Sequence, residues 1–143
     1  MKRLEIILVV IVIAVLGWIT WNQFDLAKKK ARDVERKANL HEVSKVIKLY
    51  YADYGKLPDD EEINSLWAKQ WKDGDYIYME KMPSENYTDW PYCYKTYEDG
   101  VTFGLLAELE NKGDEACKKE LVECQGRFYC FEDKMPANVE VIN

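Results

Sequence analysis

The stretch LEIILVVIVIAVLGWI, residues 4–19, decides the architecture of this chain of 143 residues. Apart from Glu5 near its start, it is an unbroken apolar run from Ile6 to Ile19. A helix rises about 1.5 Å per residue, so about 17 to 25 apolar residues cross the hydrocarbon of a bilayer. An unpaired carboxylate in hydrocarbon costs several kcal/mol, so we expect Glu5 to lie at the membrane surface or to meet a cationic partner. The run predicts an N-terminal membrane-spanning helix with one carboxylate of functional interest.

The residues on either side of the run indicate that it is retained, and they suggest its orientation. Trp18 and Trp21 lie where a cleavable signal peptide would have small residues. Lys2 and Arg3 precede the run and favour a cytoplasmic N-terminus, although the three lysines at 28–30 reduce this asymmetry. We therefore expect a retained anchor whose C-terminal side faces the exterior.

The helical pattern continues beyond the apolar run. Apolar residues recur every three or four positions between residues 26 and 54, with one change of phase near Ala38. Gly55 suits a left-handed C-cap after Tyr54, and Pro58 prevents the helix from resuming. We expect a single helix of about 50 residues, roughly 75 Å long.

The charged residues between positions 28 and 37 are expected to form the solvated face of this helix. Asp33 and Lys37 lie four residues apart, the spacing of a weak helical ion pair. The chain thus divides into a hydrophobic helix (1–24), its amphipathic continuation (25–55) and a globular head (56–143).

Charge is distributed unevenly along the chain. Residues 1–48 carry ten Lys or Arg and five Asp or Glu, a net charge of +5, whereas residues 49–143 carry ten and twenty-one, a net charge of −11. The acidic part would repel phosphates, which argues against nucleic acid as a ligand of the head. The same division favours attraction between the basic stem of one copy and the acidic head of another.

The sequence of the head predicts a short helix, an antiparallel hairpin and one further strand. Asp59 and Glu62 have capping-box spacing, and the apolar residues within 63–71 continue a helical pattern. Two alternating stretches, 92–97 and 101–107, flank an Asp-Gly turn and predict the hairpin. The other expected elements are a turn at residues 73–75, a polar and helix-prone segment at 115–122, and a third strand at 127–132.

Four cysteines, all in the head, predict two disulfides in an oxidising exterior. Zinc is disfavoured, because no two cysteines have the Cys-x-x-Cys spacing and the single histidine, His41, is distant in sequence. Three disulfide pairings are possible. We expect Cys93 to join Cys130, which would connect two strands. This leaves Cys117 with Cys124, and a bend must then shorten their helical separation of about 10 Å.

The order and spacing of these blocks resemble type IV pilins and the related pseudopilins of type II secretion. The matching blocks are the apolar start with Glu5, the stem from ARD (31–33) to LYYADYGKLP (49–58), and the hairpin from YCY (92–94) to LE (109–110). The resemblance covers nearly the whole chain. It implies an α+β, type IV pilin-like fold, in which a long N-terminal helix packs on a small antiparallel sheet with a disulfide-bonded C-terminal region.

The resemblance also implies how such a chain would assemble. In that family a prepilin peptidase cuts before the apolar segment and methylates the new amine, and the carboxylate at the fifth position pairs with the terminal amine of a neighbouring subunit. Carried onto this chain, Glu5 pairs with the methylated amine of Met1 in another copy. Its partners would be copies of itself, the membrane before assembly, the prepilin peptidase and the inner-membrane assembly machinery.

The function implied is structural: a subunit that polymerises into a type IV pilus on the cell surface and serves adhesion, twitching motility or DNA uptake. One alternative is the major pseudopilin of a type II secretion system, and another is a single-span, membrane-anchored extracellular binding module. Major pseudopilins carry a calcium loop near the C-terminus, where this chain has cysteines and no dense cluster of oxygen ligands, which favours the pilus.

Catalysis is disfavoured and no cofactor is expected. His41 and Ser44 could act as a base and a nucleophile, but no strained turn or third partner accompanies them in the sequence, so a structural histidine is favoured. The triplet beginning at Asn86 matches an N-glycosylation acceptor in an expected loop.

Overall fold

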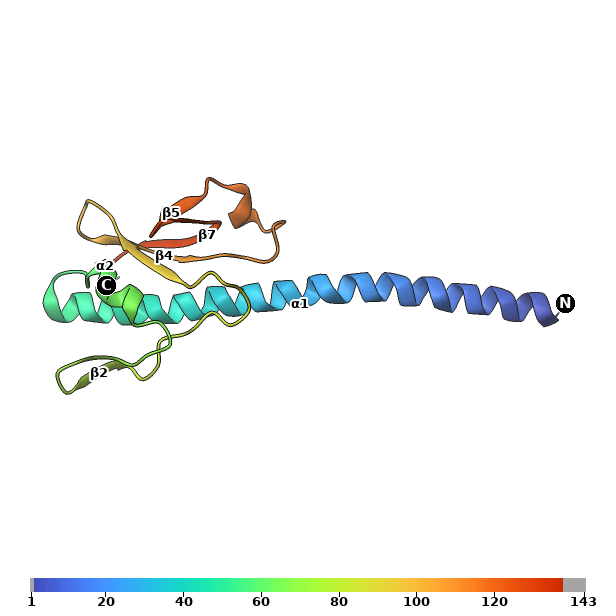
Figure 1. Cartoon of the computed structure of the whole chain (residues 1–143), viewed down its shortest axis with the longest axis horizontal. Helices are drawn as coiled ribbons and strands as arrows, with labels where there is room; N and C mark the ends of the chain where they lie inside the picture. Colours follow the sequence, from blue (N-terminus) through green and yellow to red (C-terminus); the bar gives the residue numbers. More distant parts are fainter. Residues whose placement is uncertain (1, 138–143) are drawn as a thin grey trace, which may run out of the picture.

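The computed structural model describes residues 2–137, apart from the side chains of residues 2 and 19–22. Helix α1 (Lys2–Tyr54) is continuous over 53 residues, and its N-terminal half projects from the head (Figure 1). Gly55 follows with a φ of +68°, and its N–H donates to the carbonyl of Tyr51 at 2.8 Å. A left-handed residue at this position ends the helix, as the sequence predicts.

The head combines short helices with antiparallel strands. In chain order the elements are α2 (Asp60–Ser65), β1 (Trp71–Asp73), β2 (Tyr76–Met79), β3 (Cys93–Thr96), β4 (Thr102–Ala107), the 3₁₀ helix η1 (Glu115–Lys118), β5 (Val122–Cys124), β6 (Arg127–Tyr129) and β7 (Phe131–Pro136). The main sheet has the order β3-β4-β7, and β1–β2 and β5–β6 are separate two-stranded hairpins. The expected α+β layout of a long helix on a small antiparallel sheet is confirmed.

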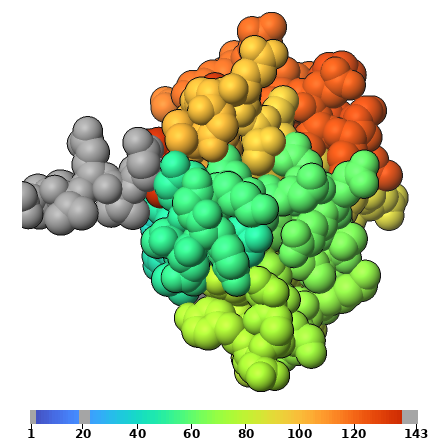
Figure 2. All heavy atoms as spheres, turned by 90° about the vertical axis from the view of Figure 1, so that its left-hand side faces the viewer, coloured from blue at the N-terminus to red at the C-terminus, as the bar shows by residue number. Residues whose placement is uncertain are grey.

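The core lies between α1 and the main sheet. Leu40, Val43 and Ile47 of α1 are fully buried, as are Phe103 and Leu105 of β4, and these residues belong to one hydrophobic cluster. Burial of each such side chain contributes about 1.5–3 kcal/mol. The main sheet and the β1–β2 hairpin lie on opposite sides of α1 in both views (Figures 1 and 2).

The second helix begins as expected but ends sooner. The side chain of Asp59 accepts a hydrogen bond from the N–H of Glu61 at 2.9 Å, which caps α2. The helix stops at Ser65, and Ala68 has a φ of +66°, a conformation that no helix continues. The prediction that Trp71 belongs to this helix is therefore wrong, because Trp71 begins strand β1 and is fully buried.

The third predicted strand, 127–132, is two strands that pair with different neighbours. β6 pairs with β5, whereas β7 pairs along β4 from Ala107↔Phe131 to Thr102↔Pro136. The change of partner falls at Cys130, which lies in neither strand. The predicted helix-prone segment is helical only in η1, because Val122 already pairs with Tyr129.

The disulfide pairing also differs from the one expected. Cys93 bonds to Cys124, with their Cα atoms 6.3 Å apart, and Cys117 bonds to Cys130 at 4.5 Å. The reason is the unpredicted β5–β6 hairpin, which brings Cys124 against β3 and turns Cys130 towards η1. Both cystine bridges thus hold peripheral segments against the main sheet.

Candidate functional site

The N-terminal half of α1 is apolar and uncovered by the head. Its large apolar side chains from Leu4 to Val15 are 48–74% exposed. The helix is long and apolar enough to cross a membrane, and none of its apolar segment is buried in the protein. Length and composition alone establish this, and a signal sequence has the same features. Contiguous exposed apolar surface of this extent needs lipid or protein to cover it.

The sequence-predicted assembly residues lie at the start of this surface. Glu5 is in the first turn of α1 and is exposed. Among the described residues, Glu5 takes part in none of the ion pairs. Met1 lies outside the described residues, so its expected pairing with Glu5 of another copy remains a prediction.

Over residues 27–38 of α1, the apolar face points away from the head. Ala27, Ala31, Val34 and Ala38 are exposed, with Val34 at 66%. The inward face over the same turns is charged instead, and its largest member is Arg36, which is 1% exposed. The prediction that the charged residues form a solvated face is wrong for Asp33 and Arg36, which are buried, because the change of helical phase near residue 38 places them beneath the head.

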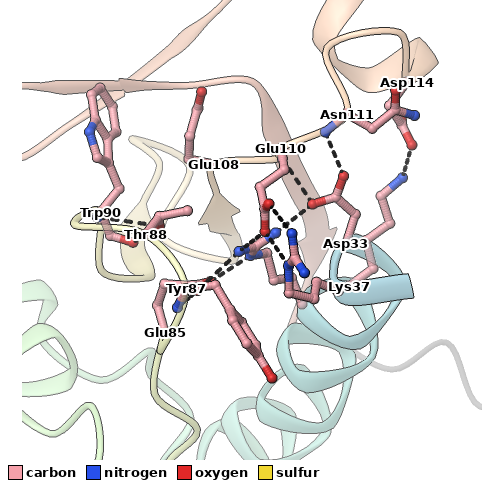
Figure 3. Close-up of polar contacts among 12 residues, drawn as sticks. Asp33, Lys37, Glu85, Tyr87, Thr88, Trp90, Glu108, Glu110, Asn111 and Asp114 are labelled. Carbon is pink, nitrogen blue, oxygen red and sulfur yellow. Dashed lines mark hydrogen bonds and ion pairs between the residues drawn. The ribbon is translucent and has the colours of Figure 1, made fainter. Parts of the chain in front are cut away.

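Arg36 is the centre of a buried ion-pair network. Its carboxylate partners Asp33, Glu85 and Glu110 are labelled in Figure 3. Its Nε donates to Glu85 Oε2 at 2.6 Å, and its Nη1 donates to Asp33 Oδ1 at 2.6 Å. Its Nη2 donates to Glu110 Oε1 at 2.8 Å. A planar guanidinium suits this arrangement, because it presents several N–H donors in fixed directions.

The remaining lone pairs of the network are also satisfied. Asp33 accepts the backbone N–H groups of Glu110 at 2.9 Å and Asn111 at 2.8 Å. Arg32 forms two further hydrogen bonds to the Glu110 carboxylate, at 2.7 and 2.5 Å. Since every buried carboxylate has several donors, the attraction can offset the desolvation of these charges.

The electrostatics follow from these contacts. The hydrogen bonds from Arg32 lower the pKa of Glu110 to about 2, against a smaller opposing effect of burial. Burial alone would lower the pKa of Arg36, but its hydrogen bonds to Glu85, Glu110 and Asp33 outweigh this and raise the pKa. Glu110 and Arg36 are therefore both ionised near neutral pH.

The network attaches two loops of the head to the stem. Glu85 belongs to the irregular stretch before β3, where the ring of Tyr87 lies 5.3 Å from the guanidinium of Arg32. Glu110 belongs to the loop after β4, which Lys37 also holds through Asp114 at 2.8 Å. The predicted pair of Asp33 with Lys37 is therefore wrong, because each has a partner in the head. The arrangement fixes the head on the helix.

The other residues singled out in the sequence do not form a reactive site. Ser44 is buried and its hydroxyl donates to the carbonyl of His41 at 2.7 Å, whereas the imidazole of His41 is exposed and lies 4.0 Å from Asp133. Asn86 is exposed, and its Oδ1 accepts a hydrogen bond from Ser84 at 3.1 Å. In the described part of the chain, no three His, Cys, Asp or Glu side chains are grouped to hold a metal ion.

The ion-pair network itself was missed by sequence reasoning. The available signal was phase: extending the buried positions Leu40, Val43 and Ile47 backwards by helical steps leads to Arg36 and Asp33. Their partners in the head come from irregular loops, which carry no periodic signal.

Comparisons with protein-family models, with curated proteins and with solved structures found no match for this chain.

Proposed function

We propose that this protein is a structural subunit that polymerises through α1 into a type IV pilus filament on the cell surface. The observation that carries the proposal is the exposed apolar half of α1, which ends in Glu5 and projects from a head with its own closed core. Lipid would cover this half before assembly, and the helices of other copies would cover it afterwards. The resemblance to type IV pilins in the order of the blocks supports the same function.

Glu5 gives such an assembly its register. A carboxylate and an amine that are both removed from water offset their desolvation only when they meet, so a subunit would dock where the two charges coincide. In the proposed filament the amine is that of Met1 in the neighbouring copy. The buried polar side chains of α1, Asp33, Arg36 and Ser44, are engaged in structural contacts, which supports a role in assembly.

The test replaces Glu5 by Gln in the full chain, with Glu35→Gln as the matched control, because Glu35 is exposed on the stem. Both proteins should remain folded in the membrane. Filaments sheared from cells are then counted by electron microscopy and identified by mass spectrometry of the N-terminal peptide. We expect Glu5→Gln to abolish filaments and Glu35→Gln to keep them. Normal filaments from Glu5→Gln would refute the pairing, and no filaments from the unaltered chain would refute polymerisation.

The second candidate is a membrane-anchored binding module that never polymerises. The capacity of α1 to cross a membrane favours it, since an anchor needs nothing more. It predicts that Glu5 is dispensable and that the chain occurs only as a membrane monomer. A type II secretion pseudopilus would give the same result for Glu5 as a pilus, and loss of protein secretion on deletion of the chain would identify it.

A further inference from the structure

We propose that the outward face of the α1 stem docks on the distal end of a second copy of this chain. This inference rests on the proposed polymerisation and names one contact between the copies. The stem face consists of Ala27, Lys28, Lys30, Ala31, Val34 and Ala38, with the exposed carboxylate of Glu35 at its edge. The distal end is the surface formed by the end of α1, the link from α1 to α2, and the β1–β2 and β3–β4 turns.

The middle of the stem face is uncovered, because Ala27, Ala31 and Ala38 are exposed. Only at one edge do Lys30 and Val34 border a depression beside the 111–115 loop of the head. The alanines of the stem face are small, so another surface can approach the helix closely. Lys28 lies 4.4 Å from the centre of the Phe24 ring, and neither Lys28 nor Lys30 takes part in an ion pair of the described chain. Lys29, in contrast, is paired with Asp25 at 3.0 Å. Among the described residues, Lys28 and Lys30 thus flank an apolar strip and lack carboxylate partners.

The distal end is one continuous surface made from four segments. The hydroxyl of Tyr54 donates to Asp73, which joins the end of α1 to the β1–β2 turn. A shallow depression lined by residues 56–61 and by Thr96, Tyr97 and Gly100 joins the α1–α2 link to the β3–β4 turn. Figure 2 looks on to this end, where the segments adjoin one another. The Tyr54–Asp73 hydrogen bond and the shared depression show that these turns belong to one face of the folded head.

This surface is acidic and aromatic. Tyr54 is 48% exposed and Tyr76 is 54% exposed. Two exposed lysines, Lys56 and Lys72, are outnumbered by exposed carboxylates. These carboxylates are Asp53, Asp59, Glu61, Glu62, Asp73, Asp75, Glu98 and Asp99.

Such a surface fits a lysine-bearing helix with small apolar side chains. Carboxylates attract ammonium groups, and tyrosine faces add cation–π attraction at close range. Tyrosine is also enriched in the centres of protein interfaces. The stem face provides both the lysines and the small residues, so a second copy satisfies the chemistry of both surfaces at once.

The helix geometry allows the contact between parallel copies. From Lys29 to Tyr54 the axis of α1 advances about 38 Å, at about 1.5 Å per residue. A copy displaced by that distance along the axis therefore brings its stem lysines level with the distal end of its neighbour. The β1–β2 hairpin protrudes sideways from α1, where it can reach the neighbouring stem (Figure 1).

The first test uses a zero-length carbodiimide, which links lysines only to carboxylates in contact. Filaments are assembled from a mixture of isotopically light and heavy full-length chain, and cross-linked peptides are read by mass spectrometry. We expect peptides that join Lys28 or Lys30 to Asp73 or Asp75 with one light and one heavy member. Filaments whose mixed-isotope links all lie elsewhere would overturn this contact while leaving polymerisation intact.

The second test reverses charges. Lys28→Glu with Lys30→Glu should lower the filament yield about tenfold, since two attractive charge pairs become repulsive together. Adding Asp73→Lys and Asp75→Lys should restore it. The control, Lys118→Glu with Lys119→Glu, makes the same charge change at exposed residues of the head and should have no effect. Equal yields from all variants would refute the contact, whereas absence of filaments from the unaltered chain would refute both proposals.

Discussion

Replacement of Arg36 by Met should destabilise the head severely, because the guanidinium donates hydrogen bonds to three carboxylates at once. The side chains of Arg36, Asp33 and Glu85 are 2%, 3% and 3% exposed, and that of Glu110 is 18% exposed. Removal of one partner from a buried ion pair costs about 3–5 kcal/mol, a large part of the about 5–15 kcal/mol that holds a typical domain together. At about 4 °C per kcal/mol, the melting temperature should fall by about 12–20 °C.

The assay is thermal unfolding of the full chain in detergent micelles. Near-ultraviolet circular dichroism reports the packing of Trp71 against Tyr50 and Tyr78, whose ring centres lie 5.5 and 5.2 Å from it. The matched control is Lys45→Met, since Lys45 and its partner Glu42 are both exposed, and it should leave the melting temperature nearly unchanged.

A double variant separates loss of charge balance from loss of packing. Arg36→Met combined with Glu85→Gln removes one of the orphaned charges, so it should recover about half of the loss. A fall of less than about 1 kcal/mol for Arg36→Met would refute the reasoning, because it would mean that the carboxylates find water or protons at little cost. A double variant that is less stable than the single one would also contradict it.

Three further predictions concern pH, the disulfides and the sheet. Because the pKa of Glu110 in the folded state is lowered to about 2, the contribution of Glu110 to the free energy of unfolding is present above its ordinary pKa and is lost as pH falls towards 2. Urea unfolding between pH 6 and pH 2 should show this loss of stability. Glu110→Gln should reduce the pH dependence, whereas Glu35→Gln should not. Cys93→Ser with Cys124→Ser opens a loop of 31 residues and should lower the free energy of unfolding by about 3.7 kcal/mol, whereas removal of the Cys117–Cys130 bridge should lower it by about 3 kcal/mol. Peptide mapping without reduction should find Cys93 linked to Cys124. Gly104→Ala would place a Cβ against the carboxylate of Glu132, which lies at the end of a flexible side chain and can move aside. The loss is then that of its hydrogen bond from Tyr97, and urea unfolding should show about 1 kcal/mol.

The parts of the fold with a strong local signal were predictable. Gly55 with Pro58 determines the end of α1, Asp59 begins α2, and the turn at residues 98–100 joins β3 to β4. Each of these signals acts within a few residues, so no knowledge of the rest of the fold was needed.

The errors fall where tertiary contacts decide the outcome. Trp71 continues a helical pattern in the sequence, but in the structure its ring packs beside Tyr50 in the core. The positive φ of Ala68 interrupts the helix before it reaches Trp71. The strand containing Cys130 divides because its two halves pair with different neighbours. In the candidate site, the carboxylates that meet Arg36 come from loops, and no local pattern could assign them to a buried guanidinium.

The two proposals are linked by the energetics of a membrane. In lipid, exchanging hydrocarbon tails for another apolar helix gains little hydrophobic free energy, because both surroundings are equally apolar. The exposed run from Ile6 to Val15 therefore permits assembly but cannot alone drive it or set its register. Charge pairs can do both: Glu5 within the apolar segment, and the stem lysines against the acidic distal end outside it.

If assembly depends on the outer contacts, it should weaken as salt is raised, because exposed pairs are screened over about 8 Å at physiological ionic strength. The buried pairing of Glu5 should be much less sensitive, so a filament yield independent of salt would leave the stem contact without an energetic role.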